Sequence, residues 1–124
     1  MKLIKFKSLA IADFIAATSV SLVGCGGAKK PSGTYTASFF TKGTIVITGS
    51  SATFDNVWMG HNAGYKDGTV ELLDWGKYDQ GAWYWKADFV LNSTYRGEEC
   101  EYYQTGFSSK NGKKVCVAGY TYSK

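Results

Sequence analysis

The feature that most constrains the fold is a series of short runs of aromatic and β-branched residues, separated by glycine-bearing turns. Such runs are typical of β-strands, and turns about every 8 to 12 residues are typical of a sandwich or barrel. No ten-residue stretch after residue 24 has helical periodicity. The sequence therefore predicts an all-β domain of about seven strands, at 34–41, 44–48, 52–58, 69–75, 82–91, 99–107 and 115–122.

The expected turns have matching chemistry. Lys42-Gly43, Gly49-Ser50, Asp67-Gly68 and Asn111-Gly112 each supply a residue that tolerates positive φ. Tight turns of this kind join antiparallel neighbours. We therefore expect a small antiparallel β-barrel, because closure removes exposed strand edges, with a two-sheet sandwich as the alternative.

The clearest alternation lies in the run 82–91. Side chains of a strand point to opposite faces in turn. We expect the more apolar face of this strand to point into the core, and that face carries Trp83, Trp85, Ala87, Phe89 and Leu91.

The N-terminus has the organisation of a secretory signal. Lys2, Lys5 and Lys7 form a positively charged beginning, and residues 8–23 are mostly apolar. This stretch is shorter than the roughly 20 apolar residues that a spanning helix needs, so it predicts an N-terminal signal helix and no membrane span.

The signal ends in Leu22-Val23-Gly24-Cys25, which resembles the lipobox of bacterial lipoproteins. The resemblance implies a diacylglycerol on the sulfur of Cys25 and cleavage before it. Residues 1–24 would then be a lipoprotein signal peptide, 25–32 a flexible tether and 33–124 a single β domain. The mature protein would be held on the outer face of a cell membrane, or on the outer membrane of an organism with two.

The charge of the mature chain is mild. Removal of residues 1–24 takes away three lysines and one aspartate, which leaves 11 basic and nine acidic residues. No run of lysine or arginine alternates with aromatic residues as in proteins that follow a phosphate backbone. We therefore expect no nucleic-acid partner.

The remaining two cysteines, Cys100 and Cys116, form a possible disulfide once Cys25 carries lipid. This disulfide would close a loop of about 15 residues and would stabilise the folded state by about 3 kcal/mol. However, a tight turn at Asn111-Gly112 would place Cys116 opposite Phe107, out of reach of Cys100. Two buried free thiols are the alternative.

The sequence offers little for catalysis. His61 is the only histidine, and no nucleophile elbow, phosphate-binding glycine loop or zinc motif is present. Glu71 and Asp74 could serve glycoside hydrolysis, but alternation in a strand would place them on opposite faces. We expect no enzyme activity, no metal and no cofactor.

The aromatic content is the best indication of a binding surface. Four tryptophans and nine tyrosines exceed what one small core readily absorbs, although they could also fill a barrel poor in aliphatic residues. Trp58, His61, Tyr65 and Trp75 flank the same loop region and are the candidate ligand-binding residues. Exposed rings suit a protein or peptide partner, or a cell-wall glycan.

One internal segment has a more specific similarity. Gly64-Tyr65-Lys66-Asp67-Gly68-Thr69-Val70-Glu71, followed by Trp75-Gly76-Lys77, is similar to the central segment of membrane-bound c-type lysozyme inhibitors. It departs from that family in placing glycine before lysine. The resemblance implies an inhibitory role for a lipid-anchored binding protein that protects its cell, while a carbohydrate-binding module is the alternative.

Overall fold

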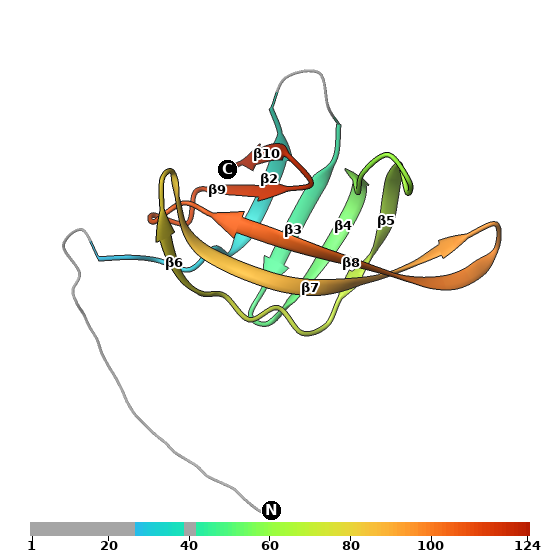
Figure 1. The fold of residues 1–124 in the computed structure, drawn as a ribbon, viewed down its shortest axis with the longest axis horizontal. Coiled ribbons are helices and arrows are strands. Elements are labelled where there is room, and N and C mark those ends of the chain that lie inside the picture. Colours follow the sequence, from blue (N-terminus) through green and yellow to red (C-terminus); the bar gives the residue numbers. More distant parts are fainter. Residues whose placement is uncertain (1–26, 39–41) are drawn as a thin grey trace, which may run out of the picture.

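The structure is a computed structural model that describes residues 27–38 and 42–124. The expected signal helix, the lipobox and Cys25 lie outside the described residues. Within the described ranges the chain forms strands and turns and no helix, which confirms the all-β prediction (Figure 1). The strands are β2 (Gly33–Ala37), β3 (Thr44–Thr48), β4 (Ser51–Trp58), β5 (Tyr65–Val70), β6 (Gly76–Gln80), β7 (Trp83–Tyr95), β8 (Glu98–Ser108), β9 (Lys114–Val117) and β10 (Tyr120–Ser123).

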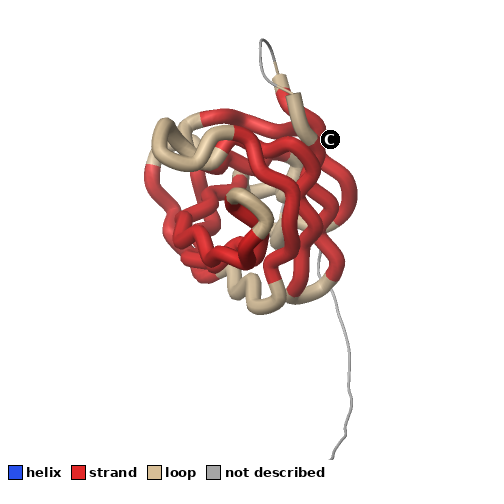
Figure 2. Tube along the Cα trace, turned by 90° about the vertical axis from the view of Figure 1, so that its right-hand side faces the viewer, coloured by secondary structure: helices blue, strands red, loops and turns tan. Residues whose placement is uncertain are grey.

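Eight of these strands close into an antiparallel barrel, in the order β5-β4-β3-β2-β10-β9-β8-β7. The ring closes where Thr69 of β5 pairs with Asn92 of β7. The ninth strand, β6, is additional and pairs with β7 near its beginning. Figure 2 shows the strands wrapped around a common interior. The predicted barrel is confirmed, and the sandwich alternative is wrong.

The barrel interior holds aromatic as well as aliphatic side chains. It comprises Tyr35, Ile45, Ile47, Ala52, Phe54, Val57, Met59, Val70, Leu73, Trp75, Ala87, Phe89, Leu91, Val115, Val117 and Tyr122. Phe54 and Phe89 meet edge to face with ring centroids 5.5 Å apart. Five aromatic rings are therefore buried in the core. They agree with the alternative that aromatic residues fill a barrel poor in aliphatic ones.

The alternation expected for the fifth run is present in β7. Ala87, Phe89 and Leu91 are buried, and the residues between them are more exposed. Trp83 and Trp85 are only half-buried. They lie where β7 also pairs with β6, and Trp85 packs against the edge of the core.

Two of the predicted strands are wrong in their limits. The expected strand 69–75 overlaps only the last two residues of β5, which ends at Val70, and residues 71–75 form an irregular connection to β6. The expected run 115–122 is two strands, β9 and β10, joined by Ala118-Gly119. Both of these turn residues have positive φ, at 50° and 87°, as a two-residue hairpin requires.

The turn predicted at Asp67-Gly68 is also wrong, since both residues lie inside β5. A Cβ atom built on Gly68 would overlap the carbonyl oxygen of Asn92. Glycine is needed here because the backbones of β5 and β7 approach closely at the closure of the barrel. The turns at Gly49-Ser50 and Asn111-Gly112 are confirmed, with positive φ at Gly49 and Gly112. Gly43 also has positive φ, but its carbonyl accepts the Ala37 N–H at 3.1 Å, so it continues the ladder of β2 with β3.

The described part of the expected tether lies against the barrel. Lys29 donates its backbone N–H to the Lys110 carbonyl at 2.8 Å, and Pro31 is buried. The Ser32 N–H donates to the Tyr35 hydroxyl at 2.9 Å. The domain is therefore packed against its own N-terminal segment from about residue 29.

Candidate functional site

Three of the four aromatic-site residues expected from the sequence come together. The Trp58 ring meets His61 with centroids 5.5 Å apart and Tyr65 with centroids 5.2 Å apart, both edge to face. Tyr120 joins them 5.9 Å from Trp58. Tyr65 is 45% exposed and Tyr120 is 38% exposed, so this aromatic cluster lies at the surface.

The loop between β4 and β5 positions the aromatic cluster. The Met59 N–H donates to the Gly64 carbonyl at 2.8 Å, which closes the loop on itself. The Gln104 amide donates to the Met59 carbonyl at 2.9 Å and ties the loop to β8. The sequence analysis missed Tyr120, because it reaches the cluster from β10 at the other end of the chain.

Trp75 does not join the cluster, so its prediction as a surface ligand contact is wrong. Its side chain is only 5% exposed. It packs in the core against Gly106, where an added Cβ would lie 3.3 Å from the ring. Its indole N–H has no hydrogen-bond partner among the described residues. Trp75 is buried because the irregular connection 71–75 returns to the barrel, which alternation in a strand did not predict.

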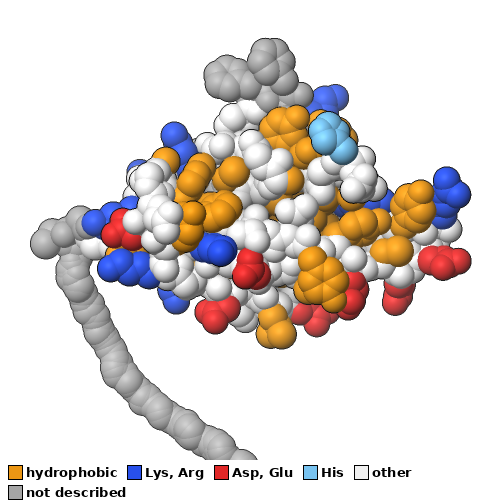
Figure 3. Space-filling view, in the orientation of Figure 1, with side chains coloured by type: hydrophobic (Ala, Val, Ile, Leu, Met, Phe, Trp, Pro, Cys, Tyr) orange, Lys and Arg blue, Asp and Glu red, His pale blue; other side chains and the backbone are white. Residues whose placement is uncertain are grey.

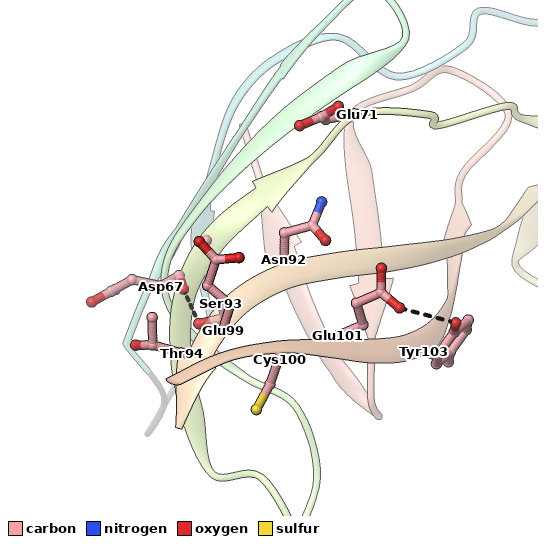
Figure 4. A pocket seen from close by; sticks show the side chains of 10 residues that line it. Asp67, Glu71, Asn92, Ser93, Thr94, Glu99, Cys100, Glu101 and Tyr103 are labelled. Carbon is pink, nitrogen blue, oxygen red and sulfur yellow. Dashed lines mark hydrogen bonds between the residues drawn. The ribbon is translucent and has the colours of Figure 1, made fainter. Parts of the chain in front are cut away.

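A different surface carries an open concavity. It lies where β5 meets the β7–β8 hairpin and is called the acidic groove (Figure 4). Its lining consists of Asp67, Gly68, Glu71, Asn92, Ser93, Thr94, Glu99, Cys100, Glu101 and Tyr103. Four of these residues are carboxylates, and none is lysine or arginine.

Register explains how the groove side chains gather. Asn92 pairs with Glu101, Thr94 with Glu99, and Val90 with Tyr103. Paired residues point to the same face, so these side chains form one row on the outer side of the hairpin. Figure 4 shows Asn92 and Glu101 on one side of the ribbon and Cys100 on the other.

Exposed apolar side chains adjoin these carboxylates. Tyr103 is 74% exposed and Leu72 is 83% exposed. Two further hollows continue along β7 and β8 past Val90, one beside Tyr103 and one beside Leu72. The Tyr103 hydroxyl donates to the Glu101 carboxylate at 3.3 Å. The sequence analysis missed both exposed residues, although their place among acidic neighbours was visible in the sequence.

Hydrogen bonds between side chains and backbone groups fix the wall of the groove that β5 supplies. Asp67 accepts the Asn56 N–H on its carboxylate at 2.6 Å. Asn56 has φ of 58°, and the pairing of β4 with β5 shifts register at this point. Ser93 donates its hydroxyl to the Asp67 carbonyl. The register shift is a β-bulge between β4 and β5, and the hydrogen bond from Ser93 joins β5 to β7. The groove therefore lies where the barrel closes.

The expected disulfide is absent. Cys100 and Cys116 are both free. Cys116 lies opposite Phe107 and Cys100 lies opposite Ser93, as the tight-turn register predicted. Burial raises the pKa of the Cys116 thiol, although a backbone hydrogen bond at Gly119 opposes that shift. The free-thiol alternative is therefore the correct one.

In residues 27–38 and 42–124, no group of three or more histidine, cysteine, aspartate or glutamate side chains could hold a metal ion. His61 is exposed in its loop, and Glu71 and Asp74 lie outside any strand. In the same part of the chain, no helix is long and apolar enough to cross a membrane.

Comparison of the chain with protein families, curated proteins and solved structures gave no match.

Proposed function

We propose that the chain is a lipid-anchored extracytoplasmic protein without catalytic activity that binds a basic protein or peptide, in a protective, immunity or inhibitory role. The acidic groove carries this proposal. It combines exposed Tyr103 with Glu71, Glu99 and Glu101 in an open concavity without a lysine or arginine in its lining, and exposed Leu72 lines an adjoining hollow.

The apolar part of the groove would supply the affinity. Large exposed apolar side chains with a polar surround are typical of protein interaction sites. A central tyrosine is among the residues that contribute most to binding when a partner covers it. Tyr103 has this position, since it borders both the acidic groove and the neighbouring hollow.

The carboxylates would make the groove selective for a basic partner and would raise the rate of association. Residues 66–74 and 92–103 contain six carboxylates and two basic residues, Arg96 and Lys66, whose Nζ donates to the Thr94 carbonyl at 3.2 Å. Such a surface steers a positively charged partner and repels an acidic one. Association should consequently slow as salt is raised, because exposed charges are screened beyond about 10 Å at 0.1 M ionic strength.

The anchor is the second part of the proposal. The lipobox at residues 22–25 supports lipid on Cys25, and lipid on that residue would hold the domain outside the cell. A surface location gives a protein-binding domain access to secreted partners, which fits a protective role.

The first partner to test is c-type lysozyme, because the segment that is similar to lysozyme inhibitors supplies Asp67, Gly68 and Glu71 to the groove. We expect the purified full chain to inhibit lysozyme at micromolar concentration. Tyr103→Ala should weaken inhibition about 30-fold, since truncation of a central aromatic costs about 2 kcal/mol. Tyr120→Ala is the control. No inhibition at micromolar concentration would remove lysozyme as the partner.

A wider test uses the culture medium of the producing cells. The immobilised full chain and its Glu99→Lys/Glu101→Lys variant would be exposed to secreted proteins, and the captured proteins identified by mass spectrometry. We expect a basic protein that only the wild type retains and that salt releases. Equal capture by both chains would contradict a role for the groove.

The second candidate function is glycan binding at the aromatic cluster. It is favoured by the exposure of Tyr65 and Tyr120 beside Trp58. Retention of the wild type on purified peptidoglycan, and its loss in Trp58→Ala but not in Tyr103→Ala, would support this function over the first.

A further inference from the structure

A second charged surface lies at the other end of β7 and β8, around β6. The segments 28–33, 76–86 and 107–114 together hold seven lysines and one carboxylate, Asp79. The lysine–aromatic face consists of these lysines (Lys29, Lys30, Lys77, Lys86, Lys110, Lys113 and Lys114) and the rings of Tyr78, Tyr84, Trp85 and Phe107. Figure 3 shows lysine and arginine side chains gathered on the side where Figure 1 places β6.

Four lysines of this face, Lys30, Lys77, Lys86 and Lys110, lie over aromatic rings. The Nζ atom of Lys77 is 5.7 Å and that of Lys110 is 5.4 Å from the centroid of Tyr84. Lys30 lies 5.6 Å from the centroid of Trp85, whose ring is 5.0 Å from that of Tyr84. Half-buried rings and exposed ammonium groups therefore form one continuous surface.

A second pair of rings extends the surface along β6. Tyr78 and Phe107 have centroids 5.2 Å apart, and the Nζ atom of Lys86 lies 5.9 Å from the Tyr78 centroid. Amphipathic aromatic rings and lysines with long apolar stems are the residue types that suit the boundary between headgroups and acyl chains.

The N-terminal segment reaches the barrel at this face. Lys29 bonds to Lys110 through its N–H, and its carbonyl accepts the Trp85 indole N–H at 3.0 Å. Four residues along the chain separate Lys29 from Cys25, a span of at most about 14 Å. If Cys25 carries lipid, as the proposed function requires, the lysine–aromatic face is held within reach of the bilayer.

We infer that the lysine–aromatic face docks on the anionic phospholipid headgroups of the membrane that holds the anchor. A lysine close to an anionic bilayer improves binding about fivefold. Seven lysines beside half-buried tyrosine and tryptophan rings match such a surface in both charge and polarity. Docking would direct the hairpin and its acidic groove away from the like-charged membrane and toward partners in solution.

The test uses the full chain purified from membranes and reconstituted in vesicles whose acyl chains carry bromine near the headgroups, which quenches nearby tryptophan fluorescence. One set of vesicles is neutral phosphatidylcholine, and the other contains one third phosphatidylglycerol. We expect clear quenching in the anionic vesicles, little in the neutral ones, and relief by salt. Lys77→Glu/Lys110→Glu should abolish the difference between the two sets.

The control charge change is Lys42→Glu, in the connection at the far end of β2 from the N-terminal segment; it should behave as the wild type. Trp83→Phe/Trp85→Phe should remove the quenching, whereas Trp58→Phe should keep it. Equal quenching in neutral and anionic vesicles would overturn the inference, as would full quenching in the Lys77→Glu/Lys110→Glu chain. Binding of the face to soluble polyphosphate with no response to anionic vesicles would overturn it as well.

The mass of the same preparation separates this inference from the proposed anchor. A lipidated chain without anionic-lipid quenching would contradict docking alone. An unlipidated chain that still shows salt-sensitive quenching on anionic vesicles would contradict the anchor alone.

Discussion

The two ends of the β7–β8 pair are built from the same strands and have opposite chemistry. At one end the hairpin around Arg96-Gly97 extends beyond the barrel closure and carries Glu99 and Glu101, two of the four carboxylates of the acidic groove. At the other end β7 pairs with β6, and lysines cover its rings. Residues in the middle of the strands, such as Ala87 and Leu91, are buried and serve the core.

The difference between the ends shows where this small barrel has freedom for function. In the central part of each strand, every second side chain must be apolar because it points into the barrel interior. Outward-facing side chains, and those of the hairpin beyond the closed ring, contact solvent and not the interior, so they can vary without loss of core packing. The exposed ring of Tyr103, which faces outward opposite Val90, and the lysine-covered ring of Tyr84 are two outcomes of that freedom.

The largest expected effect comes from breaking the closure that forms the acidic end. In Gly68→Val the new side chain would overlap the Asn92 backbone, so β5 and β7 must separate. We expect the free energy of unfolding to fall by about 3 kcal/mol, at the upper end of the range for overpacking. Urea denaturation measures this change.

The matched control is Gly76→Val at the basic end. A Cβ atom there would lie 3.9 Å from the Lys86 carbonyl oxygen, an ordinary contact, and the backbone needs no positive φ. We expect a change below about 1 kcal/mol. Equal losses at the two glycines would contradict the assignment of the closure to Gly68.

A smaller loss of stability is expected when the N-terminal segment is released from the turn before β9, near the lysine–aromatic face. The buried Tyr35 hydroxyl donates to the Gly112 carbonyl at 2.5 Å and accepts the Ser32 N–H, so it joins the N-terminal segment to the turn before β9. Tyr35→Phe should lower the free energy of unfolding by about 1 to 2 kcal/mol, because buried polar partners lose their bonds.

The same variant should speed trypsin cleavage after Lys29 while leaving binding at the acidic groove unchanged. Tyr120→Phe, in the surface cluster, serves as the control. If trypsin cuts Tyr35→Phe and the wild type at equal rates, the hydroxyl does not hold the segment.

The smallest effect is a dependence of stability on alkaline pH. Burial raises the pKa of Cys116 above its usual 9.0 and the pKa values of Tyr35 and Tyr122 above their usual 10.0. The unfolded chain therefore loses these protons at lower pH than the folded chain. Stability from these groups is fully present below about pH 9 and decreases as pH rises through the raised values.

Cys116→Ala should remove the part of this decrease that begins near pH 9, and Cys100→Ala is the matched control. Thermal unfolding followed by circular dichroism between pH 7 and pH 11 measures both. A free energy of unfolding that rises with pH in this range would contradict the raised pKa values of these three groups.

Local signals predicted the barrel but not its closure. Alternation in β7 identified the buried side of Ala87, Phe89 and Leu91 correctly. Asp67-Gly68 was mistaken for a turn, because the need for glycine arises from a strand 24 residues away in sequence. The hairpin turns Arg96-Gly97 and Ala118-Gly119 were missed, because arginine and alanine are unusual at positive φ.

The surfaces were harder to predict than the fold. Trp58, His61 and Tyr65 were grouped correctly because one short loop joins them. The acidic groove depends on the register of β7 with β8 and on the approach of β5, which no local pattern contains. Trp75 was misplaced because its connection folds back into the core instead of continuing a strand.

The most direct test of the account is the intact mass of the protein extracted from membranes, measured after thiol alkylation with and without prior reduction. We expect the mass of residues 25–124 plus a diacylglycerol, with Cys100 and Cys116 both alkylated once the domain is unfolded, whether or not it was reduced. An unprocessed chain without lipid would contradict the anchor on which the proposed location and function depend.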